Sequence, residues 1–276
     1  MSATASRQPR PDLAPPDTAV GILQARIIKQ ADHTLAMHQI LLRHIPPVLE
    51  TTHPEARFAP IEYTHVADAE ATVFAFGGMS HGLTMPIREF HGQLRGTACN
   101  VVYLKDFHLC WYQKGLLSLT RSRAETLALL ADRFGDLPRP WIFVGSSAGG
   151  HAALFFGHAM TADRVVAFGP QTYVDQAVFA GNRPKLAHET GFDFDDPEND
   201  LHDHLQGTRK IADAVIVYAG RHETDRQHAR RLAAIDGVQL MEIDTNQHAV
   251  AAVLRAQGQL KATVFGATLS TNGAGA

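Results

Sequence analysis

The sequence has little of several features that would assign it to a specialised class of protein. It holds only two cysteines, Cys99 and Cys110, in 276 residues, too few for a secreted disulfide framework, so we expect free thiols in a reducing, cytoplasmic compartment. No run approaches the ~20 apolar residues that a membrane-spanning helix needs, and the opening "MSATASRQPRPDLAPPD" lacks the apolar core of a signal peptide. The formal net charge is only −3, and this lack of basic excess argues against nucleic acid or a membrane surface as partner.

What is present is the composition of an ordinary globular chain, 45 % hydrophobic and 19 % charged, with a length that suits one large domain or at most two. We interpret residues 1–20 as a disordered tail and residues 263–276 as a C-terminal tail. A single domain is then expected over residues 21–262, with a small polar excursion at 170–213. The sequence leaves the oligomeric state open, and a homo-oligomer is compatible with it.

Apolar strand-like runs alternate with helical patterns over most of this domain. Residues 21–45 repeat apolar side chains at helical spacing and end at Pro46 and Pro47, which predicts an N-terminal helix. Several later runs are almost entirely apolar, as strands covered on both faces are. The alternation predicts an α/β fold with a mainly parallel sheet and helices on both faces. The predicted strands are 61–66, 71–76, 100–105, 141–145, 164–169, 214–219 and 238–243, and the later predicted helices are 121–134, 148–160, 225–235 and 248–260.

A crowded turn, "GSSAGG", lies between one of these strands and the helix that follows it. Gly145 and Gly149 frame Ser147 in a G-x-S-x-G pattern, which in this strand–helix context presents a serine hydroxyl as a nucleophile. The N–H of Ala148, at the start of the helix, is suited to bind an oxyanion. The alternatives are a Gly/Ser-rich turn without chemistry, and Ser146 as the nucleophile, although Ser146 lacks the symmetric glycine frame. A phosphate-binding loop is disfavoured because no Gly-Lys-Ser/Thr ending follows.

A serine hydroxyl needs a base to remove its proton and a carboxylate to orient that base. Around this kind of turn the chain order is serine, acid, histidine. Asp225 follows the strand 214–219 and precedes a helix, so we favour it as the acid, with Glu223 as the runner-up; a helix N-cap is the other role that suits Asp225. His248 follows the strand 238–243 and is the favoured base, with a core or helix-start histidine as the alternative.

Other candidates for these two roles lie at less suitable positions. Asp213 precedes its strand, which would place it at the opposite end of the sheet. His222 and His228 are close to the acid along the chain, but both precede the final predicted strand. We therefore expect Ser147 to use neither of them.

The loop 77–86, "GGMSHGLTMP", follows an early strand and is expected to supply the second oxyanion donor. Its two adjacent glycines let the backbone approach a substrate oxygen closely. The N–H of Met79 is favoured, with that of Gly78 next. His81 either lines the substrate pocket or is a solvated loop histidine. Trp111, in "KDFHLCWYQKGLL", either lines an acyl pocket or anchors its loop.

These motifs resemble the α/β-hydrolase superfamily: "VGSSAGG", "FGGMSHG", Asp225 after the penultimate strand and "NQHAV" after the last, over about residues 60–262. The resemblance implies an eight-strand-type sheet, a triad of Ser147, His248 and Asp225, and ester, thioester or amide chemistry without a cofactor. The phrases "NVVYLKDFHLCWYQKGL" and "RVVAFGPQTYVD" are similar to a bacterial subgroup of uncharacterised members. The oxyanion loop departs from the His-Gly-Gly-Gly form of many carboxylesterases.

The stretch 188–204 concentrates acids and histidines without the spacing of a metal site. A Ca²⁺ loop requires glycine where Glu198 stands. His202 and His204 are two residues apart and would not share a helix face, which disfavours Zn²⁺. We interpret the stretch as a solvated excursion over the site and expect no metal.

The sequence thus predicts a serine hydrolase, of esterase or thioesterase type, that acts on a small-molecule acyl substrate through an acyl-enzyme. Two alternatives stay open: an acyltransferase that uses the same triad, and a non-catalytic ligand-binding module on the same fold. The acyl chain and the leaving group are not specified by these motifs.

Overall fold

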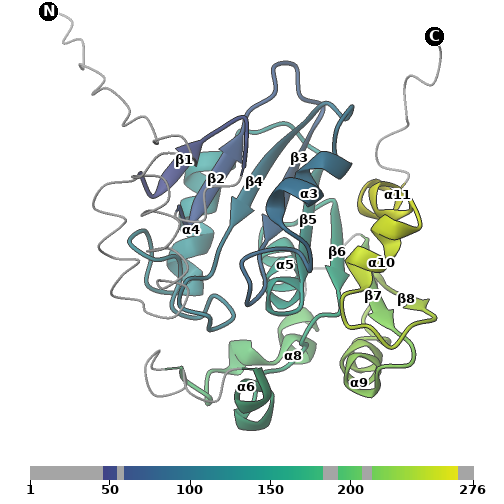
Figure 1. Cartoon of the computed structure of the whole chain (residues 1–276). Helices are drawn as coiled ribbons and strands as arrows, with labels where there is room; N and C mark the ends of the chain where they lie inside the picture. Colours follow the sequence, from purple (N-terminus) through teal and green to yellow (C-terminus); the bar gives the residue numbers. More distant parts are fainter. Residues whose placement is uncertain (1–45, 55–58, 183–191, 207–212, 267–276) are drawn as a thin grey trace, which may run out of the picture.

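The computed structural model describes residues 46–54, 59–182, 192–206 and 213–266. Its centre is an eight-stranded sheet in the order β1-β2-β4-β3-β5-β6-β7-β8 (Figure 1). β2 pairs antiparallel with β4, and the other neighbouring strands pair in parallel. Each predicted strand is present, and β1 is an addition at the edge. The strands are β1 (Val48–Glu50), β2 (Ile61–Thr64), β3 (Ala71–Phe76), β4 (Cys99–Leu104), β5 (Trp141–Ser146), β6 (Arg164–Phe168), β7 (Ala214–Ala219) and β8 (Val238–Ile243).

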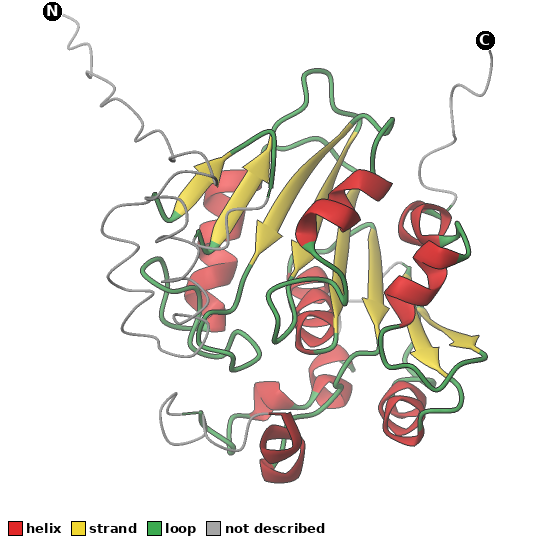
Figure 2. Ribbon diagram, viewed as in Figure 1, coloured by secondary structure: helices red, strands yellow, loops and turns green. Residues whose placement is uncertain are grey.

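Helices cover both faces of the sheet, as predicted (Figures 1 and 2). Side chains alternate between the two faces along each strand, so β3 contributes residues to the hydrophobic cores on both faces of the sheet. Its Phe74 and Phe76 pack into a cluster with α4 and α5, whereas Val73 and Ala75 pack into a second cluster with α3, α10 and α11. The helices are α3 (Ile87–Gln93), α4 (Arg123–Phe134), α5 (Ala148–Ala159), α9 (Glu223–Arg231), α10 (Val250–Ala256) and α11 (Leu260–Phe265).

The central helix α5 is buried along almost its whole length. It packs on β3, β5 and β6, and a side chain at Gly157 would bring its Cβ to 2.6 Å from Val165 Cγ2. Glycine there allows the helix to lie close to the sheet. Since α5 begins directly after the G-x-S-x-G turn, this packing fixes the position of the candidate nucleophile.

The predicted helix 248–260 is wrong in its extent, because the chain forms two helices there. α10 ends before Gly258, which has a φ of +69°. This left-handed conformation ends a helix, and glycine adopts it without steric penalty.

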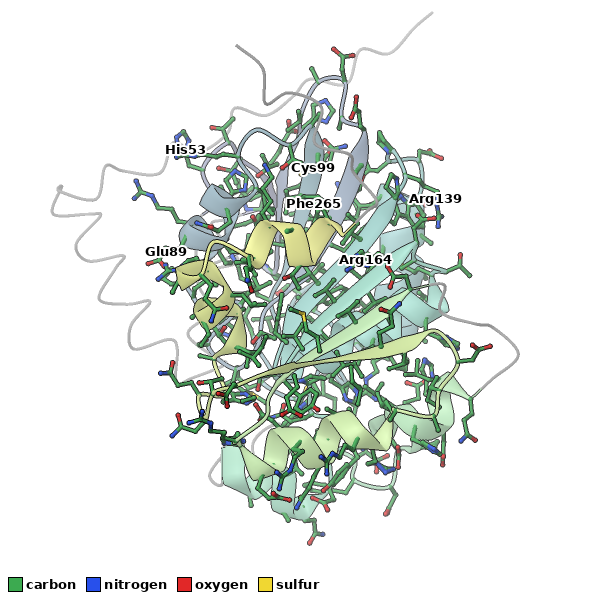
Figure 3. The ribbon with its side chains drawn as sticks, turned by 90° about the vertical axis from the view of Figure 1, so that its right-hand side faces the viewer. His53, Glu89, Cys99, Arg139, Arg164 and Phe265 are labelled. Atoms are coloured by element: carbon green, nitrogen blue, oxygen red, sulfur yellow. The ribbon has the colours of Figure 1, made fainter. Side chains whose placement is uncertain are left out.

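The predicted C-terminal tail begins too early at residue 263. Val264 and Phe265 are buried in the second cluster, so α11 belongs to the domain. Arg164 of β6 donates hydrogen bonds of 3.0 Å to the carbonyls of Thr263 and Val264, which satisfies the open end of α11. Figure 3 shows Arg164 and Phe265 on this side of the molecule.

The predicted excursion lies beyond the carboxyl ends of the parallel strands (Figure 1). Our interpretation of it as solvated is wrong for its last helix, because Leu201 and Leu205 are buried in the first cluster. Residues 183–191 and 207–212 of this segment, the predicted tail 1–20 and the predicted helix 21–45 lie outside the described residues. The described elements are α6 (Gln176–Asn182), the 3-10 helix η1 (Pro197–Asn199) and α8 (Leu201–Leu205).

Within the described ranges, every helix is too short or too polar to cross a membrane. Cys99 and Cys110 are both buried free thiols, as expected.

Candidate active site

Ser147 alone connects β5 to α5, in a strained conformation. Its φ of 57° and ψ of −119° lie outside the regions that L-residues favour, at a cost of order 1–3 kcal/mol. A Cβ at Gly145 would lie 1.9 Å from the Gly149 carbonyl oxygen, and one at Gly149 would lie 2.1 Å from that of Phe76. Only glycine fits at either place, so the two glycines of the pattern are required by close backbone contact.

The two serines of the turn differ in access to solvent. Ser146 is the last residue of β5 and is fully buried, whereas Ser147 is partly exposed. The Ser147 N–H donates to the carbonyl of Phe168, at the end of β6, over 2.9 Å. This arrangement favours Ser147 over Ser146 as the group that a substrate could reach.

The predicted acid and base contact each other at the same end of the sheet. His248 Nδ1–H donates to Asp225 Oδ1 over 2.7 Å, with the Asp225 side chain only 3 % exposed. The imidazole lies against Gly169, where a Cβ would be 3.1 Å from His248 Cε1. Gly169 directly follows Phe168, which holds the Ser147 amide. The structure therefore brings His248 over the end of β6, the strand next to β5.

Glu223, the runner-up acid, points away from this contact. It is exposed on α9, where it pairs with Arg226 and accepts a hydrogen bond from Gln227. Asp213 pairs with Arg164 where β7 and β6 begin, at the opposite end of the sheet as expected.

His222 is a neighbour of the acid that the sequence reasoning set aside. Its Nδ1 lies 3.0 Å from Asp225 Oδ1 and 3.3 Å from the Asp225 amide nitrogen, as the N-cap of α9. Its ring centroid is 5.8 Å from that of His248. In the sequence, the only indication of this contact is that His222 lies three residues before Asp225.

His228 has a structural role instead. It is buried, and the Thr172 N–H donates to its Nδ1 over 3.1 Å, which joins α9 to the chain after β6. Burial lowers the pKa of His228 to about 4.

The loop after β3 passes beside Ser147. A Cβ at Gly78 would lie 3.6 Å from Ser147 Cβ. The Gly78 N–H already donates to the Gly82 carbonyl over 2.9 Å, so this amide is engaged inside the loop. Met79, the favoured donor, follows directly and packs against a small cluster that contains Ala148. Met79 and Ala148, the two favoured donor residues, therefore belong to one packed region.

The two predicted substrate-binding side chains behave differently. Trp111 is 1 % exposed, its Nε1–H donates to Gln171 Oε1 over 2.9 Å, and its ring packs on Phe179. These contacts favour the anchoring alternative for Trp111. His81 is partly exposed in a left-handed conformation, with its ring edge-on to Phe107 at 4.7 Å, and the pocket alternative for it stays a prediction.

Asp106 shapes the loop that carries Trp111, and the sequence reasoning missed it. The Asp106 carboxylate accepts hydrogen bonds from the amides of Cys110 (2.7 Å) and Tyr112 (2.9 Å). Burial raises the pKa of Asp106. The Tyr112 hydroxyl in turn lies 3.0 Å from the Gly77 carbonyl oxygen, so the same loop supports the start of the predicted oxyanion loop.

A buried arginine joins this loop to the excursion. Arg123, at the start of α4, donates to the Trp111 carbonyl over 3.3 Å and to Asn199 Oδ1 over 3.2 Å. Gln113 also donates to Asn199 Oδ1, over 3.2 Å. This network holds the excursion against the domain beside the candidate site.

The residues that the structure describes contain no group of three or more His, Cys, Asp or Glu able to hold a metal ion. His202 bonds to Asp203, whereas His204 stacks on Phe155 at 4.2 Å. The two histidines therefore face different partners.

No protein-family model matches the chain, and no curated protein sequence matches it. Among solved structures, the chain is similar to the capsule O-acetyltransferase of Neisseria meningitidis serogroup A, with 15 % identity, a TM-score of 0.53, and coverage of 71 % of this chain and 88 % of that one. It is also similar to MPT51 of Mycobacterium tuberculosis, with 11 % identity, a TM-score of 0.52, and coverage of 74 % and 92 %. At these identities the likeness concerns the fold.

The eight-stranded sheet, its single antiparallel pairing of β2 with β4 and its helices on both faces confirm the predicted α/β-hydrolase fold. The serine turn lies at the end of its central strand β5. In open α/β sheets, ligands bind outside the carboxyl ends of the strands.

Proposed function

We propose that this protein is a serine hydrolase that cleaves an ester, thioester or related acyl bond through an acyl-enzyme on Ser147. The observation that carries the proposal is the 2.7 Å hydrogen bond between His248 and Asp225 at the strand end next to the strained Ser147 turn. A strained serine turn alone is compatible with a structural role. A buried carboxylate that orients a half-exposed imidazole beside it is the arrangement that activates a hydroxyl.

The proposed reaction follows from these groups. Because Nδ1–H of His248 donates to Asp225, Nε2 is the unprotonated nitrogen and accepts the proton of the Ser147 hydroxyl as its oxygen attacks the substrate carbonyl. The N–H groups of Ala148 and Met79 stabilise the oxyanion, each by ~3 kcal/mol on the scale of related sites. Nε2–H then protonates the leaving group, and the acyl group stays on Ser147.

A water molecule then hydrolyses the acyl-enzyme, with the same proton transfers in reverse order. His248 removes a proton from the water molecule, which attacks the acyl carbonyl, and Ser147 recovers its proton as the acid leaves. The His248 side chain is 38 % exposed, so solvent reaches the base. An alcohol or amine in place of water would give acyl transfer by the same steps.

The test is the turnover of p-nitrophenyl acetate by four proteins. Ser147→Ala should fall to the buffer rate, and Asp225→Asn should lose about 10⁴ in kcat, as in a comparable triad. Glu223→Gln is the matched control, since this exposed acid lies two residues from Asp225 and bonds only outward along α9; it should keep the wild-type rate. Equal rates for wild type and Ser147→Ala would remove the proposal.

A second assay separates hydrolysis from transfer. With a primary alcohol added, a hydrolase should release p-nitrophenol and acetate in equal amounts, whereas an acyltransferase should form the new ester instead. A protein that does not turn over p-nitrophenyl acetate and binds a ligand equally well after Ser147→Ala would be a binding module.

A further inference from the structure

Two imidazoles contact Asp225, the acid of the proposed triad. His248 Nδ1 lies 2.7 Å and His222 Nδ1 lies 3.0 Å from the same carboxylate oxygen, Oδ1. A carboxylate oxygen has two lone pairs and accepts two hydrogen bonds. The Asp225 side chain is buried, whereas both rings are partly exposed. His222 therefore shares the buried acid with the proposed base.

The tautomer of His222 decides what its contact with the acid does. Nδ1 also lies 3.3 Å from the Asp225 amide nitrogen, and one nitrogen cannot donate to the carboxylate and accept from the amide at once. An unprotonated Nδ1 would set its lone pair against a carboxylate oxygen 3.0 Å away, where burial leaves little water to screen the repulsion. A protonated Nδ1 would donate a charge-assisted hydrogen bond over the shorter of the two distances. The geometry favours the protonated nitrogen.

Backbone hydrogen bonds hold the loop of His222 independently of this side-chain contact. The Arg221 N–H donates to the Thr245 carbonyl over 2.9 Å, in the loop that leads to His248. The His222 N–H donates to the Ala219 carbonyl over 3.1 Å, at the end of β7. A substitution at residue 222 would therefore remove the imidazole without releasing the loop.

A second donor on Oδ1 restricts the rotation of the Asp225 carboxylate. The terminal torsion of an aspartate is broad, so one hydrogen bond restrains the carboxylate less than two do. Both imidazole contacts are made by Oδ1, and Oδ2 faces Gly169, where a Cβ would lie 3.4 Å from it. The two rings thus keep one and the same oxygen directed toward the base.

We propose that His222 is a positioning residue, whose Nδ1–H holds Oδ1 of Asp225 in line with His248. The carboxylate is then already aligned when His248 takes the proton of the Ser147 hydroxyl. This inference rests on the proposed function, because His222 acts on the reaction only through Asp225 and His248.

The tautomer is the first test, and it needs no substitution. In the isotope-labelled wild-type protein at pH 8, the nitrogen chemical shifts of the imidazoles distinguish a protonated Nδ1 from an unprotonated one. Nδ1 should carry the proton in both His222 and His248. A His222 with its proton on Nε2 would accept from the Asp225 amide as a helix N-cap, and that result would overturn the inference whatever the rate of ester turnover.

The kinetic test compares His222→Ala with His222→Asn in the turnover of p-nitrophenyl acetate. His222→Ala should lower kcat about tenfold and leave KM unchanged, because a hydrogen bond to a charged group is lost and the carboxylate acts on proton transfer. His222→Asn should recover kcat to within about threefold of the wild type, since its amide presents an N–H donor in place of Nδ1–H. A wild-type kcat in His222→Ala, an effect confined to KM, or an equal loss in both variants would contradict the positioning role.

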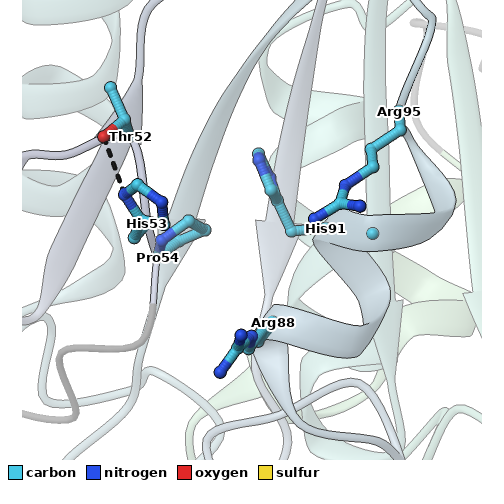
Figure 4. Close-up of a pocket in the computed structure, with 7 residues that line it drawn as sticks. Thr52, His53, Pro54, Arg88, His91 and Arg95 are labelled. Atoms are coloured by element: carbon cyan, nitrogen blue, oxygen red, sulfur yellow. Dashed lines mark hydrogen bonds between the residues drawn. The ribbon is translucent and has the colours of Figure 1, made fainter.

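Two controls separate positioning from general structural effects. Ser122→Ala removes the N-cap of α4, whose hydroxyl accepts from the Glu125 amide over 3.1 Å; it should lower the thermal midpoint and leave kcat unchanged. His91→Ala removes a half-buried histidine whose Nδ1 lies 2.9 Å from the Tyr103 hydroxyl. His91 lines a cleft between α3 and the segment after β1, and the described residues of this cleft include no member of the triad (Figure 4). Its loss should therefore leave kcat unchanged as well.

The proposed function and the positioning role fail in different ways. Turnover that is equal in wild type and Ser147→Ala would remove the proposed function, and the positioning role with it. Turnover that depends on Ser147 but keeps the wild-type kcat in His222→Ala would remove the positioning role alone.

Discussion

Two buried histidines should make the protein lose stability as the pH falls from 6.5 towards 5. His151 is fully buried on α5, where its Nδ1–H donates to the Gln171 carbonyl over 2.9 Å. Burial, and then the charge of Arg123, lowers the pKa of His151 to about 3. The pKa of His228 is lowered to about 4, chiefly by burial. A proton on its Nδ1 would also remove the hydrogen bond from Thr172.

The direction of the effect follows from where each state binds protons. Both imidazoles titrate near pH 6.5 in the unfolded chain. Below that pH the two imidazoles bind protons in the unfolded state but stay neutral in the native state. The free energy of unfolding therefore falls until the pH reaches the pKa values of the native state. Each histidine removes about 1.4 kcal/mol per pH unit, which is about 2 kcal/mol each and about 4 kcal/mol together at pH 5. That is a large part of the ~5–15 kcal/mol typical of a domain.

Asp106 acts in the opposite direction, because its raised pKa lets the native state bind a proton before the unfolded state does. A comparison of variants isolates the histidines from this effect. In His151→Asn/His228→Asn, the asparagine amide can replace each Nδ1 as donor or acceptor without titrating.

The assay is urea unfolding at pH 7, 6 and 5, followed by the fluorescence of Trp111 and Trp141. The wild type should lose about 4 kcal/mol over this range relative to the double variant. His65→Asn removes an exposed imidazole and should follow the wild type. An equal loss in the wild type and the double variant would refute the reasoning.

Two further perturbations test the packing around the site and the core. Gly149→Ala should destabilise the fold by ~1–3 kcal/mol and abolish turnover, because its Cβ would lie 2.1 Å from the Phe76 carbonyl oxygen. Gly92→Ala is the matched control on α3, where no atom beyond the neighbouring backbone lies within 4 Å of the added Cβ. It should stabilise the fold by up to ~1 kcal/mol in thermal melts. Glu62→Gln should cost ~3–5 kcal/mol, since it removes the negative charge that pairs with the buried Lys105 ammonium. The double change Glu62→Leu/Lys105→Met should recover most of that loss in urea unfolding, and a double variant as unstable as the single one would contradict the charge argument.

The strands were predictable because their signal is simple. Seven runs of apolar residues cross a sheet that is covered on both faces, and their observed limits agree with the predicted ones within about two residues. β1 and α3 were missed because three and seven residues are too few to show a period. The break between α10 and α11 was overlooked although Gly258 marks it, since an isolated glycine also occurs inside helices.

The candidate site was predictable where it depends on chain order and not where it depends on contacts across the fold. Ser147, Asp225 and His248 each follow a strand, and parallel strands bring such positions to one end of the sheet. Gly169 makes room for the imidazole of His248, and Asp106 holds a loop through backbone amides. Neither role leaves a periodic pattern, so the sequence alone gave no reason to select them.

The most direct test of the central claim is to identify the residue that a fluorophosphonate modifies. The intact wild-type protein would be treated with the probe, digested and mapped by mass spectrometry. An activated hydroxyl at the G-x-S-x-G turn predicts one adduct, on Ser147, with a labelling rate that falls in His248→Gln. An unmodified protein, or an adduct on any other residue, would contradict the account.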